Sequence, residues 1–200
     1  GIGGLIVYSP GSLLTDEMVA ALQAHGPVRW LLAPNHFHNI GIAKWKRRFP
    51  DARIVAGQGA HRRLSRICKE TGSVESLSEM SVGPGLDVME AVGTRQGEVW
   101  LSVKTGSDYV WIIGDVFTNT VDRPAGWQGL IWRFVGLGFR VNRFFWTMFA
   151  RDRTGLKGWI DQGLTNSPPC ILVPCHGEIV RDEPAELVRR LRVLLAGVRS

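Results

Sequence analysis

The feature that most constrains the fold is an alternation of short apolar runs with helical segments in the first third of the chain. Residues 5–8, 28–33 and 52–56 are apolar runs bounded by glycine, proline or polar residues, as is typical of buried strands. Between them, residues 16–24 and 40–48 carry apolar side chains at helical spacing. Strands that alternate with helices in this way predict a layered α/β fold.

The remaining two thirds of the chain continue this pattern with more glycine-rich turns. Three strand-like runs separated by such turns favour antiparallel hairpins, over residues 86–92, 98–103 and 109–113. A further strand over residues 170–173 lies between helices predicted over residues 156–164 and 186–198. Two hundred residues are enough to bury one hydrophobic core, so we expect a single domain over residues 1–200.

Three of the predicted strands deliver a metal-binding type of side chain at their carboxyl ends. His36 and His38 follow the strand at 28–33, Asp115 follows the strand at 109–113, and His176 follows the last strand. A single histidine after a strand more often serves as a hydrogen-bonding loop residue. Together, however, imidazole and carboxylate groups at strand ends suit zinc, iron or manganese. The combination therefore predicts one cleft that holds His36, His38, Asp115 and His176.

The charge and the cysteine content indicate which cellular location and which binding partners to expect. The net charge of +6 comes from 24 basic and 18 acidic residues that are spread along the chain, so we expect no specific nucleic-acid partner. The three cysteines form no C-x-x-C pair, which favours a reducing compartment and a cytoplasmic location. No uninterrupted apolar run is long enough to span a bilayer.

The strand-end segments resemble the signatures of the metallo-β-lactamase superfamily. The run NHFHNIG at residues 35–41 resembles the H-x-H-x-D-H-I-G signature of that superfamily. GDVF at residues 114–117 resembles its G-D-x-x-F segment, and VPCHGE at residues 173–178 resembles its V-P-G-H-G segment. Residues 3–10 resemble its opening hairpin. The order and spacing agree along nearly the whole chain. The resemblance therefore implies an αββα sandwich of two mixed sheets with outer helices.

The first segment departs from the signature in either register. If HNIG aligns with D-H-I-G, His36 keeps the place of the second histidine and Pro34 stands where the first belongs; His38 then replaces the aspartate and Asn39 the third histidine. In the other register, His36 and His38 match the first two histidines, and Ile40 and Gly41 replace the Asp-His pair. At least two ligands of the usual set are lost in both cases.

The mid-chain histidine of the family is absent as well, because no histidine occurs between His61 and His176. Glu98 is the only nearby substitute. The resemblance therefore implies at most one divalent metal ion, held by His36 or His38 together with Asp115 and His176. Zinc is the first expectation, with iron and manganese as alternatives. A scaffold that has lost its metal is the competing hypothesis.

The resemblance also implies roles for these residues and a class of reaction. Asp115 and His38 are the candidate catalytic residues, and four further residues are candidates for supporting the ligands or contacting the substrate: Asn35, Asn39, Glu98 and Cys175. The expected activity is metal-assisted hydrolysis of an ester, amide or phosphodiester of a small molecule. The alternative is a non-catalytic binding or assembly module. Neither a G-x-S-x-G elbow nor a phosphate-binding P-loop is present.

Residues 127–149 gather eight of the eighteen aromatic side chains, together with three arginines and no acid. We expect this segment to form a lid over the cleft or a contact between copies of the chain; contact with an anionic membrane surface and burial in the core are the alternatives. Serine at Phe144, Phe145 and Trp146 is accordingly expected to weaken association or substrate capture more than folding.

Overall fold

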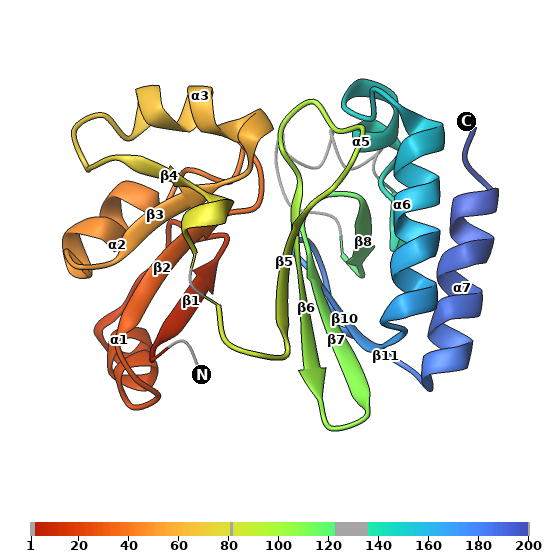
Figure 1. The fold of residues 1–200 in the computed structure, drawn as a ribbon, viewed down its shortest axis with the longest axis horizontal. Coiled ribbons are helices and arrows are strands. Elements are labelled where there is room, and N and C mark those ends of the chain that lie inside the picture. Colours follow the sequence, from red (N-terminus) through yellow and green to blue (C-terminus); the bar gives the residue numbers. More distant parts are fainter. Residues whose placement is uncertain (1–2, 81, 123–135, 200) are drawn as a thin grey trace. The chain divides into compact units, whose positions relative to one another are not determined.

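The computed structural model describes residues 3–80, 82–122 and 136–199 (Figure 1). The chain divides into two compact units. The first comprises Gly1–Pro84 with Gln96–Val99, and the second comprises Gly85–Arg95 with Trp100–Ser200. Each unit has a sheet and a hydrophobic core of its own. The predicted α/β class is confirmed; that the two units act as one domain stays a prediction.

The first unit is built on a four-stranded sheet. Its strands, in spatial order, are β1 (Leu5–Tyr8), β2 (Val28–Ala33), β3 (Arg53–Ala56) and β4 (Val74–Ser76). All three strand pairs are parallel, which differs from the mixed sheet that the resemblance implies. The difference arises because a helical connection separates each of the first three strands from the next, and a helical crossover returns the chain in a parallel direction.

Three helices cover one face of this sheet, α1 (Asp16–Gln23), α2 (Ile42–Arg48) and α3 (Gln58–Ile67), and a short 3₁₀ helix, Leu77–Glu79, follows β4. Residues of α1, α2 and α3 pack with Leu31, Ala33 and Ile54 in one buried cluster. Leu31 and Ala33 lie two residues apart on β2, so their side chains point to the same face. The helices pack on the face to which Leu31 and Ala33 point, although side chains on both faces of β2 are buried.

The second unit is built on a mixed five-stranded sheet. Its strands, in spatial order, are β11 (Val180–Arg181), β10 (Pro169–Pro174), β7 (Asp108–Ile113), β6 (Val99–Thr105) and β5 (Leu86–Glu90). Strand β10 runs parallel to β7, whereas β6 pairs with β7 in the antiparallel hairpin that the sequence predicts. A separate antiparallel pair joins β8 (Phe117–Thr120) to β9 (Gly138–Val141).

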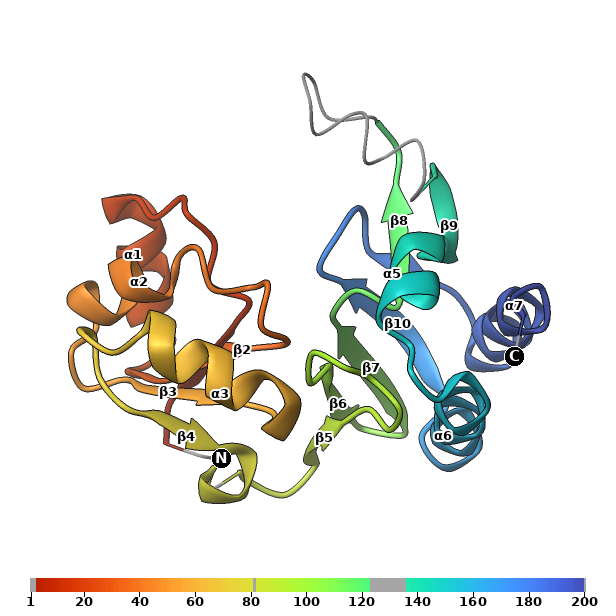
Figure 2. The same ribbon diagram turned by 90° about the horizontal axis from the view of Figure 1, so that it is seen from above.

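Two long helices, α6 (Arg153–Asn166) and α7 (Pro184–Ala196), lie side by side along the five-stranded sheet (Figure 2). Leu156, Ile160 and Leu164 of α6 recur at helical spacing and are buried in one cluster with leucines of α7. The side chain of Asp152 accepts a hydrogen bond from the backbone N–H of Gly155 and so caps α6. None of the helices in the described part of the chain combines the length and the hydropathy that a membrane span requires.

The described part of the aromatic segment corrects one expectation. Phe145 and Trp146 belong to helix α5 (Arg143–Met148) and are only 1% and 3% exposed, within the hydrophobic core of the second unit. Phe144, on the other face of this short helix, is 41% exposed. Serine at Phe145 or Trp146 would therefore damage the core. Residues 127–135, which carry the rest of the expected lid or interface, lie outside the described residues.

Candidate functional site

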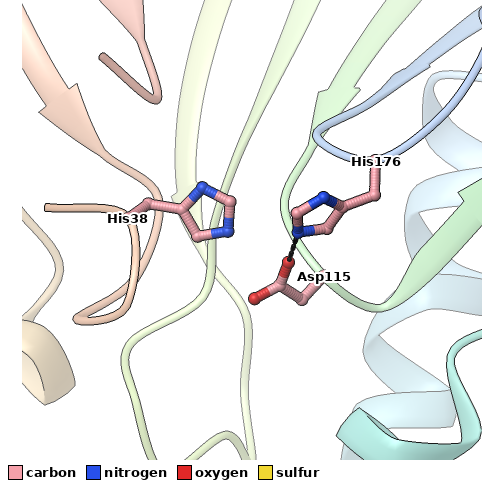
Figure 3. Close-up of side chains that lie close together, drawn as sticks. All are labelled: His38, Asp115 and His176. Carbon is pink, nitrogen blue, oxygen red and sulfur yellow. Dashed lines mark ion pairs between the residues drawn. The ribbon is translucent and has the colours of Figure 1, made fainter. Parts of the chain in front are cut away.

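In the second unit, two of the predicted site residues lie at the carboxyl ends of neighbouring parallel strands. Asp115 follows β7 and His176 follows β10, and these strands pair in parallel up to Ile113 and Pro174. The Asp115 Oδ1 atom lies 3.0 Å from the His176 Nε2 atom (Figure 3). Because parallel strands end at one edge of a sheet, residues 61 positions apart meet there. The structure thus brings Asp115 and His176 together.

Strand β8 holds the turn that carries His176. The backbone N–H of Asn119 donates to the carbonyl of His176 at 3.0 Å, and the N–H of Glu178 donates to the carbonyl of Asn119 at 2.8 Å. Gly177, between these bonds, has a φ of +100°. A Cβ atom there would collide with the carbonyl oxygen of Asn119. The glycine after His176 is therefore needed both for its backbone conformation and for the close approach of β8.

In the first unit, the loop after β2 is shaped by its two asparagines. The Asn35 Oδ1 atom accepts from the Phe37 N–H at 2.9 Å, and the Asn39 Nδ2 group donates to the carbonyl of His36 at 2.6 Å. Short polar side chains that bond to the nearby backbone stabilise tight turns. Asn39, which stands where one register places a family histidine, thus serves the turn that leads to His38.

Ser9, at the end of β1, contacts His38. The Ser9 Oγ atom lies 2.6 Å from the His38 Nδ1 atom. Ser9 has a φ of +56°, and it is the only described residue other than glycine with a positive φ. A Cβ-bearing residue reaches this left-handed conformation only at an energetic cost. Such strain persists when the surrounding contacts require it and often occurs near functional residues.

The segment after Ser9 is tied to helix α2. The Trp45 indole N–H donates to the carbonyl of Gly11 at 2.8 Å. Gly41 lies against the same carbonyl, and a Cβ atom at Gly41 would collide with it. The glycine of the NHFHNIG segment therefore permits the Ser9–Gly11 chain to approach the loop that carries His38.

Asn35 and Glu98 form a buried pair in the first unit. Both side chains are fully buried, and the Asn35 Nδ2 group donates to the Glu98 Oε2 atom at 3.1 Å. Residues Gln96–Val99 also bond to the loop through the backbone: the His36 N–H donates to the carbonyl of Gln96 at 3.2 Å, and the Val99 N–H donates to that of Pro34 at 2.7 Å. The carboxylate of Glu98 is thus held in place by the side-chain amide of Asn35.

The ring of His36 packs edge-on against Phe37, and the Arg63 guanidinium lies over the Phe37 ring. The His36 ring centroid is 4.1 Å from that of Phe37, and the Arg63 guanidinium carbon lies 5.7 Å from the centroid of the Phe37 ring. Partial burial of the imidazole, and secondly the charge of Arg63, lower the pKa of His36.

In the second unit, Cys175 extends the pairing of β10 with β7, because its backbone N–H donates to the Ile113 carbonyl at 3.0 Å. Its sulfur atom is not part of a disulfide bond.

Sequence reasoning missed two residues that position the candidate ligands. The sequence pattern marks Ser9 only as the residue after a predicted strand in the opening segment, and Asn119 carries no distinguishing motif. Both contacts join segments that are far apart in the sequence, Ser9 with His38 and Asn119 with His176. His61, which lies outside the predicted site, has a structural contact: its Nε2 atom lies 2.8 Å from the carbonyl of Val74.

Comparisons with known proteins identify the fold. No protein-family model and no curated protein matches the sequence. Among solved structures, the Flv1 flavodiiron core from Synechocystis sp. is 15% identical with a TM-score of 0.64; the match covers 97% of this chain but 50% of that one, so this chain spans half its length. A metallo-β-lactamase from Pontibacter korlensis is 14% identical with a TM-score of 0.59, covering 98% of this chain and 84% of that one.

A third structure, described as a peroxy diiron species of the chemotaxis sensor ODP, is 15% identical with a TM-score of 0.61 and covers 98% of this chain and 83% of that one. Matches at such low identity bear on the fold alone. The chain therefore has the metallo-β-lactamase fold, as the resemblance of its strand-end segments implies.

Proposed function

We propose that this chain is a metal-dependent hydrolase-like protein that holds one divalent ion through Asp115, His176 and His38. The observation that carries the proposal is the Asp115–His176 pair, in which a carboxylate oxygen and an imidazole nitrogen lie 3.0 Å apart at the carboxyl edge of a parallel strand pair. Such edges are where rigid α/β scaffolds present functional groups. His38 would join the pair from the first unit.

The chemistry of the donor set fits a metal ion. Each of the three side chains offers one ligand atom, giving two imidazole nitrogens and one carboxylate oxygen. Zinc, iron and manganese accept this combination, and three protein ligands leave a position for water or substrate. When bound, such an ion supplies a Lewis acid that activates water for attack on a carbonyl or phosphoryl group. We propose zinc first, with iron and manganese as alternatives.

The rest of the loop supports a single ion. Asn39 donates to a backbone carbonyl, and Glu98 accepts from Asn35 within a fully buried pair. One register places a family histidine at Asn39, and Glu98 is the only nearby substitute for the mid-chain histidine. Both side chains instead make hydrogen bonds within the first unit. One ion per chain is therefore the stoichiometry that we propose.

Ser9 positions His38 in this proposal. If the His38 Nδ1–H donates to the Ser9 hydroxyl, the Nε2 atom carries the lone pair that a metal ion needs. The contact also fixes the plane of the ring. Ser9 thus acts through His38 and would not contact the ion itself.

Substitutions of Ser9 should separate metal affinity from folding stability. Both Ser9→Ala and Ser9→Gly remove the hydroxyl, so both are expected to weaken metal binding by about 10- to 100-fold, as losses of such supporting contacts do. Only glycine relieves the positive φ, so Ser9→Gly should be more stable than Ser9→Ala by about 1 kcal/mol. Competition titration against a chromophoric chelator and urea denaturation measure the two effects.

An alanine variant that binds metal as tightly as the parent chain would show that Ser9 has no part in positioning His38. Equal stability of the two variants would show that the backbone at residue 9 carries no strain that glycine relieves.

The proposed activity is hydrolysis of an ester, amide or phosphodiester of a small molecule. A panel of chromogenic substrates of these three classes is assayed with the chain loaded with zinc, iron or manganese, after chelation, and as Asp115→Asn. We expect turnover of at least one class that is lost in both controls. Turnover that survives chelation and the substitution would assign the activity elsewhere. A chain that binds its ion but turns over no substrate would favour the non-catalytic binding or assembly module.

The remaining assignments rest on fewer observations. A reducing, cytoplasmic location is proposed because the three cysteines, Cys68, Cys170 and Cys175, form no C-x-x-C pair and none of them is in a disulfide. Self-association and peripheral membrane contact through residues 127–149 stay proposals. Their described part contributes an exposed Phe144 and an exposed Arg143 to the surface.

A further inference from the structure

The second unit contains a pocket of about 350 Å³ that is separate from the Asp115–His176 pair. It lies between helix α6 and the sheet strands β5, β6 and β7, toward the end of β7 opposite to Asp115. Its lining residues are mostly aromatic or polar and include Trp100, Tyr109, Trp111, Trp159, Asp87 and Gln162. The volume is in the range of small-molecule binding sites.

Four aromatic rings form the apolar wall of this pocket. The Trp100 ring centroid lies 5.6 Å from that of Trp111, with an interplanar angle of 52°, and 5.0 Å from that of Trp159, with an angle of 69°. The rings are tilted against one another instead of stacked face to face. Trp159 and Tyr109 are half-buried, so part of their surface remains open to a ligand.

The charge of the lining is unusual for this basic chain. Asp87 is the one charged residue among those that line the pocket, although basic residues exceed acidic ones by six in the sequence. Lys104, which pairs with Tyr109 across β6 and β7, is exposed and does not line the pocket. Aromatic rings and one carboxylate, without a lysine, arginine or histidine, are the chemistry that recognises organic cations.

Two buried polar atoms lie on the face of the sheet that carries the pocket. The Trp111 Nε1 atom and the Ser102 Oγ atom are buried without a hydrogen-bond partner among the described residues. Ser102 and Trp111 are direct partners across β6 and β7, so their side chains are neighbours on one face. Neither atom is accessible enough for a ligand to reach it, so recognition in the pocket rests on the aromatic rings and on Asp87.

We propose that this pocket binds a small quaternary ammonium compound. The aromatic rings and Asp87 would contact the cationic head. This binding does not depend on the metal ion proposed for Asp115, His176 and His38.

A pair of isosteric probes tests the proposal on the unmodified chain. Choline is a quaternary ammonium alcohol, and 3,3-dimethylbutan-1-ol has the same shape without the charge. Titration followed by tryptophan fluorescence and by calorimetry should give a choline affinity at least about tenfold above that of the neutral alcohol, which corresponds to a cation–π and carboxylate contribution of ordinary size. Equal affinities, or no binding of either compound, would overturn the proposal.

Two glycines of helix α6 provide a matched pair of variants. A Cβ atom at Gly163, which lines the pocket, would lie 3.2 and 3.4 Å from the Trp111 ring, whereas at Gly158 it would meet no heavy atom within 4 Å. Alanine favours a helix at either site. Gly163→Ala should weaken choline binding by about tenfold, and Gly158→Ala should leave it unchanged. Equal binding by the two variants would place the site elsewhere.

Asp87→Asn tests the carboxylate without disturbing the core, because Asp87 is exposed. We expect it to weaken binding of choline and to leave binding of the neutral alcohol unchanged. A variant that binds choline as tightly as the parent chain would contradict the assigned role of Asp87.

Discussion

Alanine at Phe145 or Trp146 is expected to lower the free energy of unfolding by about 3–5 kcal/mol for each substitution. Both side chains are almost fully buried in the core of the second unit, where Phe145 packs against Phe149 with ring centroids 6.2 Å apart. Removal of a large ring from such a site loses apolar burial and leaves a cavity that the surroundings fill only in part. Urea denaturation followed by circular dichroism measures the change.

Phe144→Ala is the matched control for these variants, because Phe144 lies on the same short helix but is 41% exposed. We expect it to change the free energy of unfolding by less than about 1 kcal/mol. If the three variants were destabilised equally, or if none of them were, the placement of α5 against the core would be wrong.

Asp115→Ala is expected to reduce metal affinity by at least about 100-fold, because loss of a direct ligand should exceed the effect of losing a supporting contact. The carboxylate is the one anionic donor among the three proposed ligands, so its removal also deprives the ion of charge neutralisation. Competition against a chromophoric chelator gives the affinity.

Asp108→Ala serves as the control, since Asp108 begins the same strand, β7, and is exposed. Its metal affinity should equal that of the parent chain. An Asp115→Ala variant with unchanged affinity would remove Asp115 from the site, and equal losses in both variants would indicate a general effect on the fold.

Much of the fold could be predicted from the sequence because its signals are local. The strand at Val28–Ala33 was expected with the same bounds as β2, and the buried face of α7 follows from leucines at helical spacing. The meeting of Asp115 with His176 could also be anticipated, since each follows an apolar strand and the strands proved to be parallel neighbours.

The sequence did not reveal features that depend on contacts between distant segments. Nothing local to Ser9 indicates a positive φ or a partner 29 residues away, and nothing local to Asn119 indicates its bonds to the His176 turn. The expectation that Phe145 and Trp146 matter more for association than for folding was wrong for a related reason. Composition records that Phe144, Phe145 and Trp146 are apolar, but only the position of α5 determines which of them face the core.

The central claim, a single metal ion held by Asp115, His176 and His38, is tested most directly by the metal content of the full chain. Protein purified without chelators and then supplemented separately with zinc, iron or manganese is dialysed and analysed for metal and protein. The account predicts about one ion per chain for the metal that fits, and loss of that ion in Asp115→Ala, His176→Ala and His38→Ala. Two ions per chain, or none with any of the three metals, would contradict it.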